Sequence, residues 1–207
     1  HMQNQPLLWD DSESFMKPQE RNTNQQLAEN LAQLGYKEIV ANYTYVDAEQ
    51  IAALLKEVPH AIAGFHGTGI DLGGGAGLVS STIAQNSNVQ RVYCIEGVVS
   101  VVRLLQPIVK EKILGPQSNK VISVAGNYDQ IQLPDNSIDF AVAWDSMHHS
   151  ASPIDTFHEC FRVLNPGGIF VVVDRAHDNA TPDSEIERML NIVYDSSFLE
   201  SSYRDPT

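Results

Sequence analysis

Hydrophobic residues in the second half of the chain form short unbroken runs separated by polar and glycine-containing segments. Runs of this kind, rich in Val and Ile, are typical of strands that are buried on both faces. The strands predicted in this way cover residues 68–72, 91–95, 120–125, 138–144 and 168–173. Apolar residues with helical spacing lie between them, at 77–85, 98–113 and 153–163. Strands that alternate with helices predict an α/β fold, with a doubly wound, mostly parallel sheet covered on both faces.

The first part of the chain has a different pattern. Residues 1–24 are polar and contain several Pro, Asn and Gln residues, which predicts an arm without a core of its own. Residues 25–63 contain leucines with helical spacing and are expected to form a helical lid. We expect residues 64–207 to form the core that carries the sheet.

One helix start in the lid segment has a specific signature. Asp47 is followed three residues later by Gln50, the spacing of a capping box, which predicts a helix over 47–58. The preceding segment 39–46 is β-branched and aromatic but short, so that it fits a helix or a strand.

Composition excludes several classes of function. The chain has 13 Lys and Arg against 26 Asp and Glu, a formal net charge of −13, which repels nucleic acid and anionic membranes. Its two cysteines, Cys94 and Cys160, lack the spacing of a disulfide framework or a zinc site, which favours a cytoplasmic setting. No window is long and apolar enough to predict a membrane span.

A glycine-rich segment follows the first core strand. Asp71 is followed by glycines at every second position, namely Gly73, Gly75 and Gly77, with Gly74 between them. Such glycines allow positive φ and a close approach of the backbone to a ligand. The spacing does not fit the G-x-G-x-x-G pattern of a dinucleotide loop.

The D-x-G-x-G-x-G pattern resembles motif I of the class I S-adenosylmethionine-dependent methyltransferases. Residues 127–140, which include Leu-Pro-Asp-Asn-Ser-Ile-Asp, and residues 161–168, Phe-Arg-Val-Leu-Asn-Pro-Gly-Gly, are similar to two further segments of that family. The resemblance covers roughly residues 64–175 and is strongest to the small-molecule branch that includes ubiquinone and menaquinone C-methyltransferases. It implies S-adenosyl-L-methionine as cofactor, S-adenosyl-L-homocysteine as product and a small molecule as methyl acceptor.

The resemblance also implies roles for single residues. The loop glycines with Asp71 would cradle the methionine and ribose parts of the cofactor. Glu96 ends the second core strand, where a carboxylate can accept hydrogen bonds from ribose hydroxyls. The further cofactor-binding residues predicted in this way are Gly97, Asn127, Tyr128, Asp129 and Asp145.

The residue that contacts the adenine is left between two candidates. Asp129 lies four residues before Leu133, the family's spacing, whereas Asn127 directly follows Gly126, where the family has Asp. An amide oxygen can accept a hydrogen bond from the adenine amino group as a carboxylate can.

The segment after the fourth core strand, Trp-Asp-Ser-Met-His-His, resembles an S-x-x-L-H-H element of the same branch. We predict His148 or His149 as the base that deprotonates the acceptor, because histidine titrates near neutral pH. Alternatively, the pair only orders this loop. A divalent metal held by Asp145, Asp174 and His177 is a further option, but we predict no metal.

The family's fold ends in a strand hairpin that this sequence does not show. After residue 173 the sequence predicts one helix and a polar tail. The strand at 168–173 would then be an exposed edge. We expect a shortened chain, a homodimer that covers this edge, or a strand supplied by residues 39–46.

Three other functions compete with methyl transfer. The chain could be a non-catalytic scaffold that binds the cofactor or a protein, since a fold alone does not prove chemistry. A nicotinamide-dependent oxidoreductase would use the same fold but a different glycine spacing. An aminopropyl transferase would need acidic residues that hold a polyamine.

Overall fold

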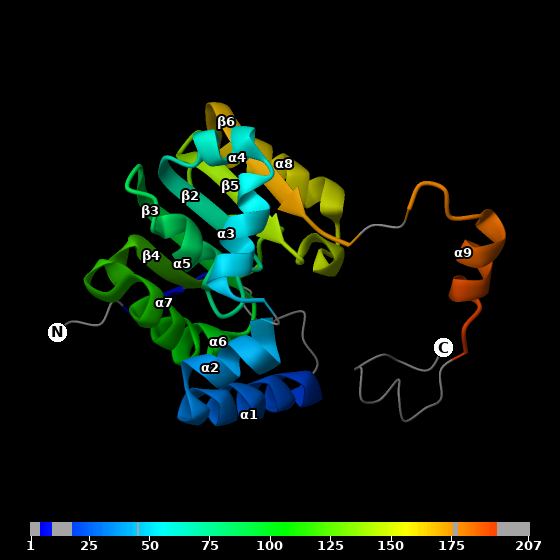
Figure 1. The fold of residues 1–207 in the computed structure, drawn as a ribbon, viewed down its shortest axis with the longest axis horizontal. Helices are drawn as coiled ribbons and strands as arrows, with labels where there is room; N and C mark the ends of the chain where they lie inside the picture. Colours follow the sequence, from blue (N-terminus) through cyan, green and yellow to red (C-terminus); the bar gives the residue numbers. More distant parts are fainter. Residues whose placement is uncertain (1–4, 10–17, 45, 176–177, 194–207) are drawn as a thin grey trace. The chain divides into compact units, whose positions relative to one another are not determined.

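The structure is a computed structural model that describes residues 5–9, 18–44, 46–175 and 178–193 (Figure 1). The chain divides into two compact units, residues 1–174 and 175–207. The first unit contains the sheet, and the second contains helix α9 (Asp183–Leu190). The predicted core, residues 64–207, therefore extends over both units.

The sheet has six parallel strands in the order β1-β4-β3-β2-β5-β6. The strands are β1 (Leu7–Leu8), β2 (Gly67–Leu72), β3 (Val89–Glu96), β4 (Val121–Ala125), β5 (Ile138–Trp144) and β6 (Leu164–Val173). The five core strands and the doubly wound fold predicted from the apolar runs are confirmed. Strand β6 begins at Leu164, earlier than predicted, because the Asn-Pro-Gly-Gly segment continues its pairing with β5 through an irregularity in register.

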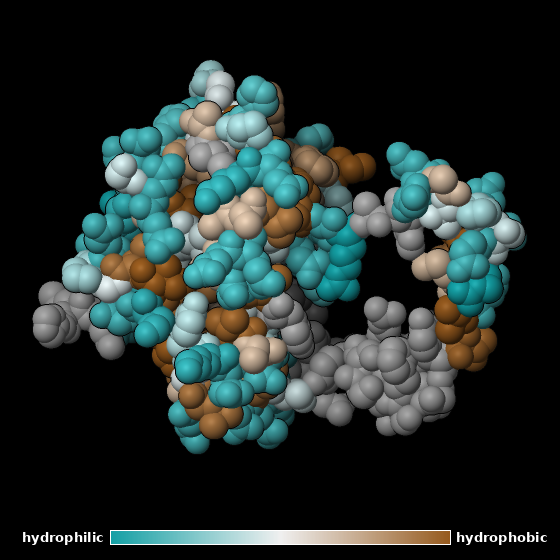
Figure 2. Space-filling view, in the orientation of Figure 1, coloured by the Kyte–Doolittle hydropathy of each residue, from teal (hydrophilic) through white to brown (hydrophobic). Residues whose placement is uncertain are grey.

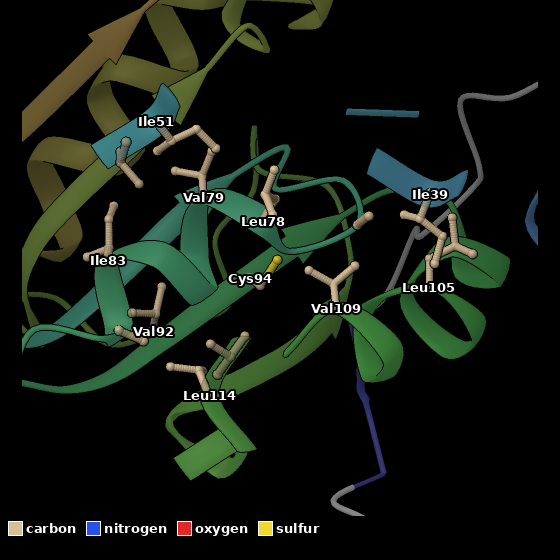
Figure 3. Close-up of a cluster of buried hydrophobic side chains, with 14 of the residues drawn as sticks. Ile39, Ile51, Leu78, Val79, Ile83, Val92, Cys94, Leu105, Val109 and Leu114 are labelled. Atoms are coloured by element: carbon tan, nitrogen blue, oxygen red, sulfur yellow. The ribbon is translucent and has the colours of Figure 1, made fainter. Parts of the chain in front are cut away.

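Helices cover both faces of this sheet. The helices of the first unit are α1 (Pro18–Leu34), α2 (Tyr36–Ile39), η1 (Val40–Thr44), α3 (Ala48–Lys56), α4 (Pro59–Gly64), α5 (Leu78–Ala84), α6 (Val99–Leu104), α7 (Gln106–Leu114), η2 (Gly115–Lys120), η3 (Met147–His149) and α8 (Pro153–Val163). Figure 3 shows one core cluster, in which Ile51 of α3 lies beside Val79 of α5 and Ile39 of α2 lies beside Leu105. A second cluster packs α8 against the opposite face of the sheet through Cys160.

The N-terminal arm differs from the prediction. Helix α1 begins at Pro18, so the end of the predicted arm 1–24 is helical. Strand β1 extends the sheet beside β4, and the Trp9 amide donates to the Ala125 carbonyl at 2.8 Å. Trp9 is 7% exposed, and its side chain packs over Gly126, where a Cβ would lie 2.7 Å from the ring. A polar segment therefore docks on the core through one aromatic side chain.

The secondary structure of two further segments was established only by the structure. Residues 39–44 are helical, in α2 and the π-helix η1, and residue 45 lies outside the described part, so the alternative in which residues 39–46 supply a strand is wrong. The predicted helix 98–113 is divided into α6 and α7 at Leu105. Pro107 near the start of α7 lacks the amide that an uninterrupted helix would use.

The order of the strands reverses between β2 and β5. From β2 the chain adds β3 and then β4 on one side, and it adds β5 and then β6 on the other. Ligands of open α/β sheets bind beyond the carboxyl ends of the strands at such a reversal. The residues described after Val173 contain one regular element, helix α9. Among the described strands, β6 pairs only with β5.

Candidate cofactor and active site

The glycine loop connects β2 to α5 at the strand reversal. Gly73, Gly75 and Gly77 all have positive φ, at +67°, +52° and +85°. These angles lie in the left-handed region, where a side chain causes strain and glycine does not. The Gly77 amide donates to the Gly74 carbonyl at 2.8 Å, which closes the loop on itself.

Asp71 lies beneath this loop and not on its surface. The residue is 1% exposed, and its carboxylate accepts a hydrogen bond from Ser80 Oγ at 2.6 Å. Burial raises the pKa of Asp71 to about 6. A Cβ at Gly74 would lie 2.5 Å from Cys94 Sγ and 2.9 Å from Asp71 Oδ2. Asp71 therefore packs beneath the loop, and its contact with the cofactor stays a prediction.

Glu96 joins the glycine loop to the loop that follows β3. Its Oε2 accepts a hydrogen bond from the Gly75 amide at 3.1 Å, and its Oε1 accepts one from the Val98 amide at 2.9 Å. Desolvation raises the pKa of this half-buried carboxyl, while hydrogen bonds from Val98, Gly75 and Gly97 act in the opposite direction. The carboxylate stands at the end of β3, where the sequence places the ribose contact.

Two residues that the sequence did not indicate also hold the glycine loop. Gln106 is fully buried, and its Nε2 donates to the Gly75 carbonyl at 2.9 Å. Tyr43 of η1 is close enough that a Cβ at Gly75 would meet its ring at 3.3 Å. Burial, and then the charge of Glu96, raise the pKa of Tyr43 well above its usual value. A polar residue inside an apolar run was the available signal for Gln106, whereas Tyr43 lies in the segment whose type was left open.

The two adenine candidates have different surroundings. The Asp129 carboxylate accepts hydrogen bonds from Ser150 Oγ at 2.8 Å, from the Ala151 amide at 3.3 Å and from Thr156 Oγ1. Asn127 directly follows β4 and Gly126, and its Oδ1 accepts from the Asp129 amide at 2.9 Å. Asp129 thus anchors the segment that leads into α8, while Asn127 stands at the strand end.

Tyr128 and Ser146 link three strand ends. The Tyr128 hydroxyl donates to the Ser146 carbonyl at 2.8 Å, and Ser146 Oγ donates to the Leu72 carbonyl at 2.6 Å. Desolvation raises the pKa of Tyr128. A Cβ at Gly73 would lie 2.7 Å from Ser146 Cβ, so this glycine is required by close packing as well as by its φ. The carboxyl ends of β2, β4 and β5 are therefore held together around the loop.

The predicted histidine pair lies in η3, directly after β5. His148 Nδ1 lies 2.8 Å from Asp174 Oδ1, and the His148 amide donates to Asp174 Oδ2 at 3.2 Å. The rings of His148 and His149 are adjacent, with centroids 4.1 Å apart. Asp145 has φ +49°, and its amide donates to the Val173 carbonyl at 2.7 Å. Asp174 was predicted only as a metal ligand, and the structure places it on His148.

Three of these side chains could also hold a cation. One ligand atom each of Asp145, His148 and Asp174 lie within 4.8 Å of one another. The set considered from the sequence contained His177 in place of His148, and His177 lies outside the described residues. Because His148 Nδ1 already faces Asp174 at hydrogen-bond distance, the hydrogen-bonded pair accounts for this geometry, and the absence of a metal stays a prediction.

The model of the methyltransferase domain family matches residues 70–172, the stretch from β2 to β6 that contains the glycine loop, Glu96 and the histidine pair. These residues belong to the class I S-adenosylmethionine-dependent methyltransferase family. S-adenosylmethionine is the cofactor of this family, so the predicted recognition, fold class and cofactor are confirmed. The oxidoreductase alternative is not favoured, in agreement with the glycine spacing.

Similar proteins support the same assignment. Sterol 24-C-methyltransferase erg6 of Aspergillus fumigatus is 37% identical over 70 residues, which are 32% of this chain and 19% of that protein. A solved structure of a proposed S-adenosyl-L-methionine-dependent methyltransferase from Methanococcus maripaludis has a TM-score of 0.57 at 20% identity, with 80% of this chain and 70% of that chain covered. A proposed sarcosine dimethylglycine methyltransferase from Galdieria sulphuraria has a TM-score of 0.55 at 23% identity, with 70% and 52% covered.

These matches support different conclusions. The match to the sterol methyltransferase spans about a fifth of that relative's length, so it bears on the methyltransferase domain and not on the whole protein. The two solved structures, at 20% and 23% identity, show the fold.

Proposed function

We propose that this chain transfers the methyl group of S-adenosylmethionine to a small-molecule acceptor. The observation that carries the proposal is the position of Glu96, which joins the positive-φ glycine loop to the next loop at the strand reversal, inside the methyltransferase domain. The sterol methyltransferase relative supports a small molecule as acceptor. The acceptor atom, whether oxygen, nitrogen or carbon, stays open.

The residues present fit the cofactor. Among the described residues, a Cβ at Gly75 would meet only the Tyr43 ring within 4 Å, which leaves the rest of this part of the loop backbone open to a ligand. The backbone of the glycine loop would lie against the methionine part, while Glu96 would hold the ribose hydroxyls and Asn127 the adenine amino group. When bound, the cofactor supplies an electrophilic methyl group on a sulfonium.

The chain's contribution to the chemistry is alignment and proton removal. With Nδ1 donating to Asp174, a neutral His148 has its lone pair on Nε2, from which it can accept a proton from the acceptor. Asp174 also holds the His148 backbone amide, so it fixes both the ring and the loop. His149 is the alternative base, and Asp145 would line the methionine end of the cofactor.

The proposal also includes the division of the chain into an arm, a lid and a core. Residues 25–63 would form the lid that excludes water over the core, with residues 1–24 as the arm. The position of the Tyr43 ring, 3.3 Å from where a Cβ at Gly75 would lie, supports this function, because it brings the lid segment close to the glycine loop.

We also propose a cellular compartment and an oligomeric state for the protein. Among the described residues, no helix is both long and apolar enough to cross a lipid bilayer. Both cysteines are free and buried, which supports a reducing, cytoplasmic setting. Among the described strands, β6 is an edge strand, and its Val172 is 41% exposed. Phe157 of α8, whose ring packs against Phe170 of β6, and Phe161 of α8 are also exposed, which supports a homodimer through this edge. Sedimentation velocity should then show a dimer that Val172→Lys dissociates, and a monomer at all concentrations would contradict it.

The function is tested by calorimetric titration of the full chain with S-adenosylmethionine, S-adenosylhomocysteine and NADH. Binding of both sulfur compounds without binding of NADH is expected. Incubation with methyl-labelled S-adenosylmethionine and a panel of small-molecule alcohols, amines and enols should then yield S-adenosylhomocysteine and labelled product. Binding without transfer to any acceptor would favour the non-catalytic scaffold, and binding of NADH alone would favour the oxidoreductase.

A further inference from the structure

A cavity lies between α1 and α6, and no residue of the glycine loop is among those that line it. Its volume is about 610 Å³, and its walls come from α1 and α6, two helices that lie side by side (Figure 1). Helix α1 contributes Arg21, Asn22, Gln25 and Glu29, and α6 contributes Ser100 and Arg103. Volumes of 300–1,000 Å³ are typical of sites for small organic ligands.

The cavity is lined by hydrogen-bond donors without partners among the described residues. Ser100 Oγ is buried and has no hydrogen-bond partner in that part of the chain, which is unfavourable unless a ligand or water supplies one. Neither Arg21 nor Arg103 forms an ion pair within the described part of the chain. By contrast, Arg162 pairs with Glu159 and Asp135.

The charge of the cavity is unusual for this protein. The chain carries twice as many acidic as basic residues, yet the described residues that line this cavity include two guanidiniums and one carboxylate. That carboxylate, Glu29 Oε1, accepts a hydrogen bond from Gln25 Nε2 at 2.9 Å on the same helix. Guanidinium groups and a hydroxyl donor together match the oxygens of a carboxylate or phosphate.

We propose that the cavity between α1 and α6 binds a small organic oxyanion, a carboxylate or a phosphate monoester, through Arg21, Arg103 and Ser100. Val99 and Leu104 supply apolar wall for the carbon part of the ligand. The cavity is much larger than an inorganic anion, which leaves room for the carbon skeleton of an organic one. The site joins α1 to α6, the helix that follows the Glu96 loop, and it does not depend on the methyl-transfer proposal.

The test uses the full chain and three probes without cofactor: phenyl phosphate, phenylacetate and uncharged benzyl alcohol. Binding is measured by NMR titration of ¹⁵N-labelled protein. We expect phenyl phosphate or phenylacetate to shift amide signals of α1 and α6 in a saturable manner, and benzyl alcohol to leave them unchanged. Absence of saturable shifts for both anions, or equal binding of benzyl alcohol, would overturn the proposal.

Variants locate the site. The double variant Arg21→Gln/Arg103→Gln should weaken anion binding at least tenfold, and Ser100→Ala should weaken it to a smaller extent. The matched control Arg91→Gln changes an exposed arginine of β3 that does not line the cavity, and it should leave the affinity unchanged. Equal loss in Arg91→Gln would indicate nonspecific attraction and overturn the site.

A final experiment distinguishes this site from the cofactor site. The affinity for S-adenosylhomocysteine should change less than twofold in the double variant, because the oxyanion is a separate molecule. A loss of tenfold or more would mean that the arginines hold the carboxylate of the cofactor, and the proposal of a separate site would be wrong.

Discussion

Glu96 is the single residue on which the cofactor proposal depends most directly. Its two carboxylate oxygens accept from amides of two different loops, so the side chain orients both loops and stays available as a charged acceptor. Glu96→Gln keeps the shape but turns an NH₂ group toward a backbone amide. We expect affinity for S-adenosylhomocysteine to fall by roughly 1.5–3 kcal/mol, about ten- to a hundredfold in Kd, measured by calorimetry.

The matched control for Glu96 is Glu57→Gln, which neutralises an exposed carboxylate just after α3. This change should leave the Kd within twofold. An unaltered Kd in Glu96→Gln would remove Glu96 from the ribose role.

His148 is distinguished from its neighbour by Asp174. If His148 is the base, then His148→Ala should lower kcat by about 10² or more, with little change in affinity for S-adenosylhomocysteine. Asp174→Asn keeps the size of the side chain but loses the carboxylate that faces Nδ1, so kcat should fall while KM changes little. His149→Ala is the matched control. A larger loss of kcat in His149→Ala than in His148→Ala would assign the base to His149.

Because of Asp71, the free energy of unfolding should depend on pH in a way that an exposed carboxylate does not cause. Its folded pKa, about 6, lies above its ordinary value of 3.8 because of burial. The stability it contributes is therefore fully present below about pH 4 and is lost as pH rises through 6. Relative to Asp71→Asn, the wild type should lose about 2 kcal/mol of unfolding free energy between pH 4.5 and 7.5.

Urea unfolding at several pH values measures this difference. Glu49→Gln, which changes an exposed carboxylate of α3, should give a curve parallel to that of the wild type. If the unfolding free energy of Asp71→Asn instead changes with pH in parallel with that of the wild type, Asp71 is ionised in the folded protein without cost.

The segment that leads from η3 into α8 is held by one side chain from the β4 loop. Asp129 receives hydrogen bonds from Ser150, Ala151 and Thr156, so Asp129→Ala would leave several polar groups without their acceptor. We expect a loss of roughly 1–3 kcal/mol in unfolding free energy and a lower Tm, with affinity for S-adenosylhomocysteine nearly unchanged. Asn127→Ala should show the opposite pattern. If Asp129→Ala lowers affinity more than stability, Asp129 contacts the adenine.

The extent to which the sequence predicted each element depends on the range of the interactions that form it. The core strands were predictable because burial on both faces requires unbroken apolar runs. The glycine loop was predictable because its backbone conformation restricts residue type. Strand β1 was not, because its pairing with β4 depends on Trp9 packing over Gly126, a contact between residues far apart in sequence.

The same distinction applies to the candidate site. Glu96 and the histidine pair lie at strand ends that the predicted topology brings together. The inward position of Asp71, the anchoring function of Asp129 and the approach of Tyr43 depend on side-chain packing between elements. Such packing leaves no local pattern in a single sequence.

At the scale of the whole molecule, a net charge of −13 produces self-repulsion that opposes the compact state. The face of residues 1–174 seen in Figure 2 is largely hydrophilic, so much of this charge is accessible to counterions. Salt screens such charges, with a Debye length of about 10 Å at 0.1 M. We expect Tm to rise by about 2–4 °C between 0.02 and 0.3 M NaCl at pH 7.5, the shift that about 1 kcal/mol gives in a chain of this size.

The choice of salt and pH decides whether this gain comes from charge. Sulfate stabilises proteins by exclusion from their surface, so NaCl is the appropriate salt. Near the sequence pI of about 4.8 the net charge vanishes, and the difference in Tm between the two NaCl concentrations should vanish with it. A gain of equal size at both pH values would mean that salt acts on apolar burial, and that the acidic surface does not limit the stability of this protein.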